Sequence, residues 1–314
     1  MLKGIIFALS ACLIWGLIFV VPEFMEGFSP IEIALGRYFF YGVVSLFILL
    51  KMRLRGLCHY PWDIWKRAFQ YSLIITIFYY TCVVLAVQNA SPAICALVLG
   101  ISPIAIAFYG NWQQKECSYR SLILPSVLII VGLVVINAPK FAESTSPDNY
   151  LFGVLCSFFA LMAWSWYVVA NSRFLKNNPQ VATHNWSTLI GVATFCWVIV
   201  FSGIVWMFFE EFLELDKHFT YGMELTNFLM GCAVLGLLCS WVGAFLWNTA
   251  SVHLPVPLAG QMTIFETIFG VIFVYALDRN LPPQQECLGI ALLLAAIIYG
   301  IRTSVQGAPQ HAAT

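Results

Sequence analysis

The chain has 314 residues, of which 61% are hydrophobic and 10% are charged, and its 15 basic and 15 acidic residues cancel. Together with a mean hydropathy of +0.85, this composition excludes an ordinary soluble domain. The sequence is that of an integral membrane protein.

Long uncharged intervals between clusters of charge predict the membrane spans. A bilayer-crossing helix needs about 20 mostly apolar residues. Intervals too long for one helix divide at "QNASPA" (88–93), at "SVHLPVP" (251–257) and in the loop "KNNPQVATHNW" (176–186). The pattern therefore predicts ten helices, near residues 3–22, 31–50, 68–88, 93–110, 120–137, 151–170, 187–208, 227–250, 254–277 and 285–302.

Basic residues predict the orientation. With the N-terminus inside, eleven Lys and Arg residues fall on the cytoplasmic side and three, Lys140, Lys217 and Arg279, fall outside. We expect both termini to be cytoplasmic and the protein to lie in the inner (plasma) membrane. No small-x-small cleavage site follows the first apolar run, so we expect that run to be a retained helix rather than a signal peptide.

The two halves of the chain show an internal duplication. "ACLIWG" (11–16) aligns with "ALMAWS" (160–165) at an offset of 149, and "SPIEIALGR" (29–37) aligns with "NPQVATHNW" (178–186). Further along, "AVQNASP" (86–92) resembles "ASVHLPV" (250–256), and Pro103 falls opposite the pair Glu266 and Thr267, with the offset grown to about 164.

Each repeat contains five predicted helices, an odd number, so the second copy must enter the membrane from the opposite face. The sequence therefore predicts an all-α integral membrane protein whose ten transmembrane helices form two inverted five-helix repeats. Such an architecture is typical of secondary transporters. The expected units are a first repeat over residues 1–140, an outer linker loop over 141–150, a second repeat over 151–303 and a flexible cytoplasmic tail over 304–314.

Several motifs carry a resemblance to a known family. They are Ala-x3-Trp-Gly in the first helix, Ser-Pro before the second helix, Arg37 within it, "LAVQNASPAICALVLGISP" through Pro103, and Glu116. Their order resembles the EamA-type repeat of the drug/metabolite transporter superfamily over essentially the whole chain. The sequence departs from the family pattern at Pro125, at Ala296 and at Glu266.

The resemblance implies a secondary transporter that exports amino acids or related small metabolites by alternating access. The abundance of aromatic residues, 16% of the chain, leans weakly toward aromatic or apolar amino acids. Cationic drugs or other metabolites are the alternative substrates. A non-transporting receptor or scaffold is the alternative from another class of protein.

Two ionisable residues at membrane depth are candidate substrate ligands, because such residues are costly in lipid and generally face a cavity or a partner. Glu266 lies twelve residues into the ninth predicted helix. It can bind a substrate amine or couple transport to protons, or it can lock its helix against a neighbour. Arg37 lies six residues into the second helix, where it can hold an anionic group, pair with a carboxylate or snorkel to the surface.

Aromatic residues are further candidates for the binding site. Trp15 and Trp164 lie deep in the first and sixth predicted helices, at positions related by the repeat. They can wall a central cavity from both halves, since aromatic faces suit apolar and cationic ligands; ordinary helix packing is the alternative. Additional aromatic candidates are Tyr38, Tyr79, Tyr80, Trp166 and Trp186.

Two further residues complete the candidate site. Gln261 is the polar residue that we expect to orient a substrate, because it precedes Glu266 by about one and a half turns. Pro103 removes a backbone hydrogen bond from the fourth helix, and we expect either a freed carbonyl or a tolerated kink there.

The sequence gives little support to an enzyme. It lacks GxSxG, HExxH and GxGxxG motifs, and its ten cysteines show neither CxxC nor Cys/His metal spacing. We expect no cofactor, no metal and no nucleic-acid partner. The expected partners are a small-molecule substrate, the lipid bilayer and protons as a candidate coupling ion, and the protein is expected to be a monomer or a homodimer.

Overall fold

The computed structural model describes residues 1–52, 60–90, 92–115, 117–142, 149–208 and 222–306, and these residues form helices without any strand. In chain order the helical elements are α1 (Leu2–Gly16), η1 (Leu17–Phe19), η2 (Val21–Phe24), α2 (Pro30–Met52), α3 (Trp62–Ser72), η5 (Leu73–Phe78), α4 (Tyr79–Asn89), α5 (Pro92–Gly100), α6 (Ser102–Gln114), α7 (Tyr119–Ala142), α8 (Tyr150–Asn177), α9 (Thr183–Phe208), α11 (Met223–Val234), η7 (Leu235–Val242), α12 (Gly243–His253), α13 (Val256–Met262), α14 (Ile264–Leu277) and α15 (Gln284–Gln306).

The predicted ten transmembrane helices are confirmed by length and composition. We number them as spans 1 to 10, and they cover Leu2–Phe24, Pro30–Lys51, Trp62–Asn89, Ile94–Gln113, Tyr119–Ile136, Tyr150–Asn177, Thr183–Phe208, Met223–His253, Val256–Leu277 and Gln284–Thr303. Span 3 begins earlier than predicted and span 6 ends later, because each continues for about two turns through residues carrying charge.

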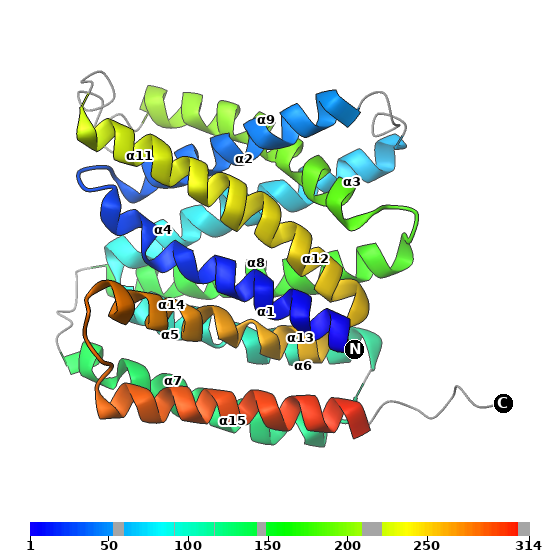
Figure 1. The fold of residues 1–314 in the computed structure, drawn as a ribbon, viewed down its shortest axis with the longest axis vertical. Helices are drawn as coiled ribbons and strands as arrows, with labels where there is room; N and C mark the ends of the chain where they lie inside the picture. Colours follow the sequence, from blue (N-terminus) through cyan, green and yellow to red (C-terminus); the bar gives the residue numbers. More distant parts are fainter. Residues whose placement is uncertain (53–59, 91, 116, 143–148, 209–221, 307–314) are drawn as a thin grey trace.

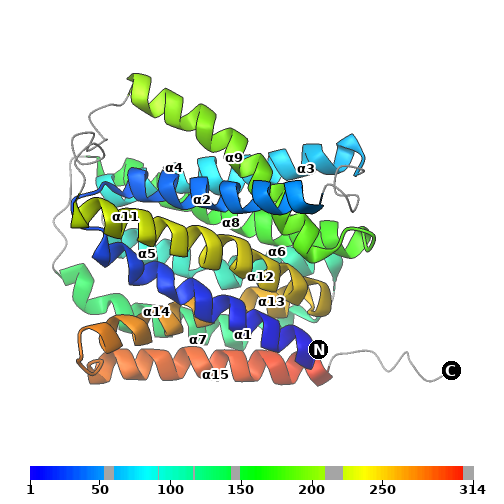
Figure 2. The same ribbon diagram turned by 45° about the horizontal axis from the view of Figure 1, so that its top comes forward.

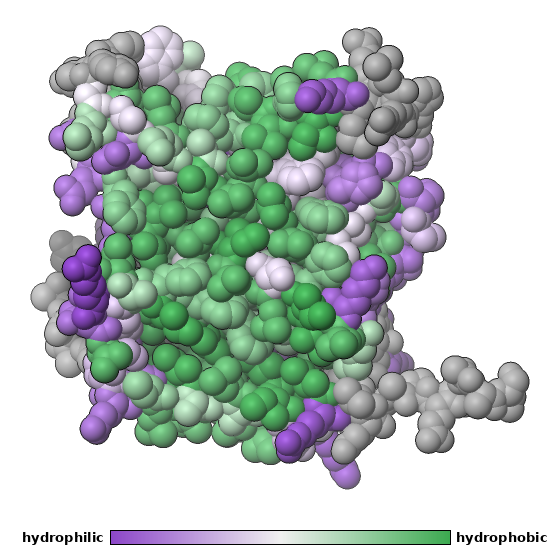
Figure 3. Space-filling view, in the orientation of Figure 1, coloured by the Kyte–Doolittle hydropathy of each residue, from purple (hydrophilic) through white to green (hydrophobic). Residues whose placement is uncertain are grey.

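An apolar outer surface accounts for the helical fold. In lipid every backbone polar group must be bonded internally, so a chain this apolar satisfies its backbone by forming helices. Figure 3 shows a broad hydrophobic face with hydrophilic residues gathered toward its two sides. Large apolar side chains such as Phe47 and Leu151 are exposed on this bundle, as expected for residues that contact lipid.

The two halves share the same irregularities, which supports the predicted inverted repeat. A π-helical segment interrupts span 3 at Leu73–Phe78 and span 8 at Leu235–Val242. Spans 4 and 9 each break at a single residue, Ile101 and Thr263. The π segments begin 162 residues apart (235 minus 73) and the breaks also lie 162 residues apart (263 minus 101).

The packing of the helices follows the same two-fold relation. α2 packs against α9 and α7 against α15, which pairs equivalent helices of the two halves, and α6 of span 4 packs against α13 of span 9. The contact of α1 with α12 is mirrored by the contact of α8 with α4. Figures 1 and 2 show that α1 and α8 begin at opposite ends of the bundle, so the halves are inverted, and that α15 ends where α1 begins.

The proposed unit boundaries stay predictions. Most of the expected linker loop (141–150) and most of the expected tail (304–314) lie outside the described residues, which stop at 142, resume at 149 and end at 306. The face of the membrane on which the termini lie likewise stays a prediction.

Candidate functional site

A cavity of about 730 Å³ lies between the two halves. Its walls include Trp247 and Asn248 near the middle of the bundle, and Tyr275 and Asp278 at the end of α14. Figure 1 shows that α14 ends at the side of the bundle opposite the N-terminus. The cavity therefore runs from the centre of the protein toward that end, where Asp278 is exposed.

Glu266 lines this cavity from the first turn of α14. The break at Thr263 creates that turn: the Glu266 N–H donates to the Thr263 carbonyl at 3.0 Å, and the Thr263 hydroxyl donates to the Gly260 carbonyl at 2.7 Å. A helix N-terminus carries partial positive charge, which stabilises a carboxylate in the first turn. Within the described residues the Glu266 side chain has neither a hydrogen bond nor an ion pair, so its oxygens are available to a ligand.

Arg37 lines the same cavity from α2, in the other half of the chain. Its Nε donates to the Ser240 hydroxyl at 2.9 Å, and among the described residues this is the only hydrogen bond of the guanidinium. Arg37 and Glu266 line the same cavity, but the ion pairs of the described residues do not include them. Opposite charges thus face one water-accessible space without neutralising each other in direct contact.

The two repeat-related tryptophans meet in the wall of the cavity. The rings of Trp15 and Trp164 have centroids 6.1 Å apart in an edge-to-face arrangement. The ring centroids of Trp247 and Trp15 are 5.4 Å apart, and those of Tyr79 and Trp164 are 5.8 Å apart. Trp15 Nε1 donates to the Cys239 carbonyl at 2.8 Å, which fixes its ring. The result is an aromatic wall built from both halves.

Tyr38 and Tyr80 extend this aromatic lining toward α2. Their rings pack edge to face with centroids 6.1 Å apart, and the Tyr80 hydroxyl donates to the Pro30 carbonyl at 3.1 Å. Pro103 also lines the cavity, in the first turn of α6 directly after the break at Ile101.

Three residues proposed from the sequence lie elsewhere. Gln261 is 3% exposed and is not among the cavity residues; it lies close to Gly300 of α15. Five residues of helix turn the chain by about 140° from the direction of Glu266, which explains the difference. Trp186 is fully buried and bonded to Asn171 at 2.7 Å, and Trp166 lines a separate pocket.

Sequence reasoning missed several cavity residues. Trp247, Tyr41 and Tyr167 all line the cavity, but aromatic residues are so common in this chain that type alone does not single them out. Asn248 also lines it, with its amide engaged: it accepts from Asn171 at 2.7 Å and donates to Ser187 at 2.9 Å. Its polarity inside span 8 was the usable signal.

Comparison with known proteins relates this architecture to a transporter family. Residues 2–138 match the model of the EamA-like transporter family. The first half of the chain is therefore similar to the EamA-like transporter family. The match confirms the resemblance predicted from the sequence motifs, and the matching family is one of transporters rather than of enzymes.

Relatives extend the similarity over the second half. The chain is 28% identical over 312 residues to the inner membrane protein YtfF of Escherichia coli (strain K12), covering 96% of each protein. It is 24% identical over 197 residues to the uncharacterized transporter YyaM of Bacillus subtilis (strain 168), covering 60% of this chain and 61% of the relative. Together with the ten apolar helices, these similarities support a membrane transporter and a multi-pass inner membrane protein.

A solved structure supports the fold independently. A crystal structure of a protein superposes with a TM-score of 0.75 at 17% sequence identity, covering 98% of this chain and 99% of its own. The fold of that structure thus extends over both halves of this chain.

Proposed function

We propose that this EamA-related transporter is a secondary active exporter of amino acids, with a preference for aromatic or apolar side chains. The observation that carries the proposal is that Arg37 from the first half and Glu266 from the second line one cavity. The other charged residues of the lining, Asp278 and Glu286, lie after the end of α14 and in the first turn of α15. A free amino acid carries a carboxylate and an ammonium group, which complement the side chains of Arg37 and Glu266.

The aromatic wall fits the remainder of such a substrate. Trp15, Trp164 and Tyr79 present ring surfaces to the cavity, and ring surfaces pack favourably against apolar and aromatic groups. Because the cavity lies between the two inverted halves, movement of one half against the other would expose it to each side of the membrane in turn. Glu266 is also the candidate group for coupling export to protons.

Export of cationic drugs is the second candidate, favoured by the same aromatic wall together with the carboxylate of Glu266, since aromatic faces attract cations. Arg37 argues against it, because a second positive charge in the cavity would repel a cation. A receptor that does not transport is the candidate from another class.

Counterflow in proteoliposomes tests the proposal. Wild-type protein would be assayed with labelled amino acids and labelled cations, with and without a pH gradient. The proposal expects saturable exchange of an amino acid. Exchange of cations alone would support drug export, and exchange of no compound would support the receptor.

A further inference from the structure

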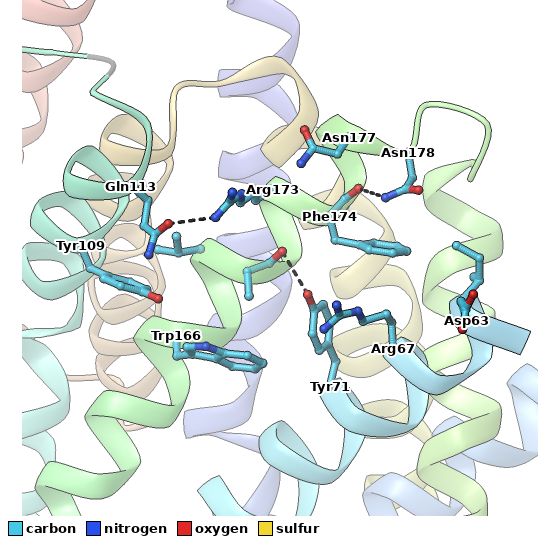
Figure 4. Close-up of a pocket in the computed structure, with 13 residues that line it drawn as sticks. Asp63, Arg67, Tyr71, Tyr109, Gln113, Trp166, Arg173, Phe174, Asn177 and Asn178 are labelled. Carbon is cyan, nitrogen blue, oxygen red and sulfur yellow. Dashed lines mark hydrogen bonds between the residues drawn. The ribbon is translucent and has the colours of Figure 1, made fainter.

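A second pocket, of about 470 Å³, lies apart from the central cavity. Figure 4 shows that it is formed by the start of α3, the end of α6 and the end of α8. These parts lie at the end of the bundle where the chain begins (Figure 1). The proposed transport cycle uses no residue of this pocket.

The rim of the pocket attracts anions. Arg173 Nη1 donates to the amide oxygen of Gln113 at 2.9 Å, and Arg67 Nη1 donates to the amide oxygen of Gln70 at 3.2 Å. Amide oxygens leave the charge of a guanidinium uncompensated. The lining contains one carboxylate, Asp63, whose Oδ1 lies 3.5 Å from Lys66 Nζ. Two arginines and one aspartate give the pocket residues a formal charge of +1.

The floor of the pocket is apolar and aromatic. Tyr71 and Trp166 pack edge to face with ring centroids 5.4 Å apart, and the Tyr71 hydroxyl donates to the Ala170 carbonyl at 3.3 Å, so its polar atom is used within the protein. Tyr109 and Phe174 complete this surface (Figure 4). A ligand of this pocket therefore needs an anionic group beside an apolar body.

The floor continues the outward-facing apolar stripe of α8. Leu155, Phe159 and Met162 are exposed by 47%, 52% and 52%, and they recur at helical spacing with Trp166 and Arg173. Exposed apolar side chains on a membrane-spanning helix contact lipid chains. The pocket thus lies at the end of an exposed apolar stripe on α8.

The part of the stripe nearest the pocket, from Met162 to Arg173, matches one leaflet of a bilayer in length. Eleven residues separate Met162 from Arg173, which corresponds to roughly 16 Å of helix. Half of the hydrocarbon core of a bilayer is about 15 Å thick. Arg173 also lies four residues before the end of α8, at the level expected for lipid phosphates.

From these observations we infer that the pocket binds an anionic phospholipid, with its phosphate on Arg67 and Arg173 and an acyl chain along the stripe of α8. Guanidinium groups bind phosphate through paired, charge-assisted hydrogen bonds. Basic pockets between membrane helices are suited to anionic headgroups. Trp166 lies where amphipathic rings prefer to sit, between the chains and the headgroups.

Native mass spectrometry of the full-length protein in neutral detergent tests this site. Phosphatidylglycerol and phosphatidylcholine with identical chains would be titrated separately. We expect phosphatidylglycerol to bind preferentially and the Arg67→Gln/Arg173→Gln variant to weaken that binding by about tenfold or more. Arg173→Lys keeps the positive charge but loses the paired N–H donors of the guanidinium, so its affinity for phosphatidylglycerol should lie between those of the wild type and the double variant.

Arg302→Gln is the matched control. It removes an exposed arginine from α15 at the same end of the bundle, outside the pocket. An equal loss of binding in this control would overturn the proposal by showing a general effect of charge. Equal binding of phosphatidylcholine, or displacement of phosphatidylglycerol by inorganic phosphate or by an amphiphilic carboxylate, would overturn it too, since the last two results would assign the pocket to a soluble anion.

Discussion

Spans 4 and 9 break at equivalent positions, yet the two breaks carry different chemistry. After Ile101, α6 begins with Pro103 in its first turn, and after Thr263, α14 begins with Glu266 in its first turn. Proline fits there because the first N–H groups of a helix have no intrahelical acceptor. Glutamate fits there because its carboxylate meets the positive end of the helix.

The comparison shows that the duplicated halves share a backbone but not a ligand set. Span 9 presents a negative charge to the cavity, whereas span 4 presents an apolar ring. The positive charge comes instead from Arg37 in span 2. An asymmetric site inside a two-fold frame suits a substrate whose two polar ends differ, as those of an amino acid do.

Glu266→Gln is the change with the largest expected effect, because it removes the charge that distinguishes span 9 from span 4. We expect amino-acid exchange to fall by about tenfold to a hundredfold, the range for losing a hydrogen bond to a charged group. Counterflow measures the effect. Glu224→Gln, an exposed carboxylate at the start of α11, is the control and should exchange at the wild-type rate.

Arg37→Gln should have the next largest effect, a rise of about tenfold in the half-saturating concentration of substrate. Ser240→Ala removes the acceptor that holds Arg37 Nε and should produce a smaller rise, because the charge stays in the cavity. Substrate titration of the exchange rate checks both variants. An effect of Ser240→Ala larger than that of Arg37→Gln would contradict a direct role for the guanidinium.

Trp15→Ala and Trp164→Ala are each expected to weaken substrate binding, but the structure separates their effects on stability. Trp15 is 8% exposed and donates a hydrogen bond to Cys239, so its truncation should cost about 3 to 5 kcal/mol. Trp164 is less buried and should cost less. Thermal unfolding and substrate affinity would be compared; equal melting losses with unchanged affinity would assign both rings to packing.

Pro103→Ala and Thr263→Ala should have the smallest effects. Alanine is compatible with the first turn of α6, and Thr263→Ala deletes one local hydrogen bond to Gly260. Each change should alter the free energy of unfolding by about 1 kcal/mol or less. Thermal unfolding in detergent measures this. A much larger loss at one break alone would show that the two breaks are not equivalent in the fold.

The number and order of the spans were predictable from the sequence, because apolar runs indicate segments inside the bilayer and charge clusters indicate segments outside it. The ends of the spans were harder to predict. Asp63, Lys66 and Arg67 lie inside α3, although their charges predict a loop. Pro103 marks the break at Ile101 in the sequence, whereas no proline follows the break at Thr263 within span 9. Gln261 was expected beside Glu266 but lies against α15, because five residues of helix place the two side chains about 140° apart.

The central claim is that Arg37 and Glu266 hold opposite ends of one substrate. Counterflow with substrate analogues tests this claim most directly. Labelled phenylalanine would be exchanged against phenylalanine, phenethylamine or 3-phenylpropionate in wild type, Arg37→Gln and Glu266→Gln. We expect wild type to prefer the compound carrying both charges, Arg37→Gln to lose its discrimination against phenethylamine, and Glu266→Gln to lose its discrimination against 3-phenylpropionate. Unchanged discrimination in both variants would contradict the account.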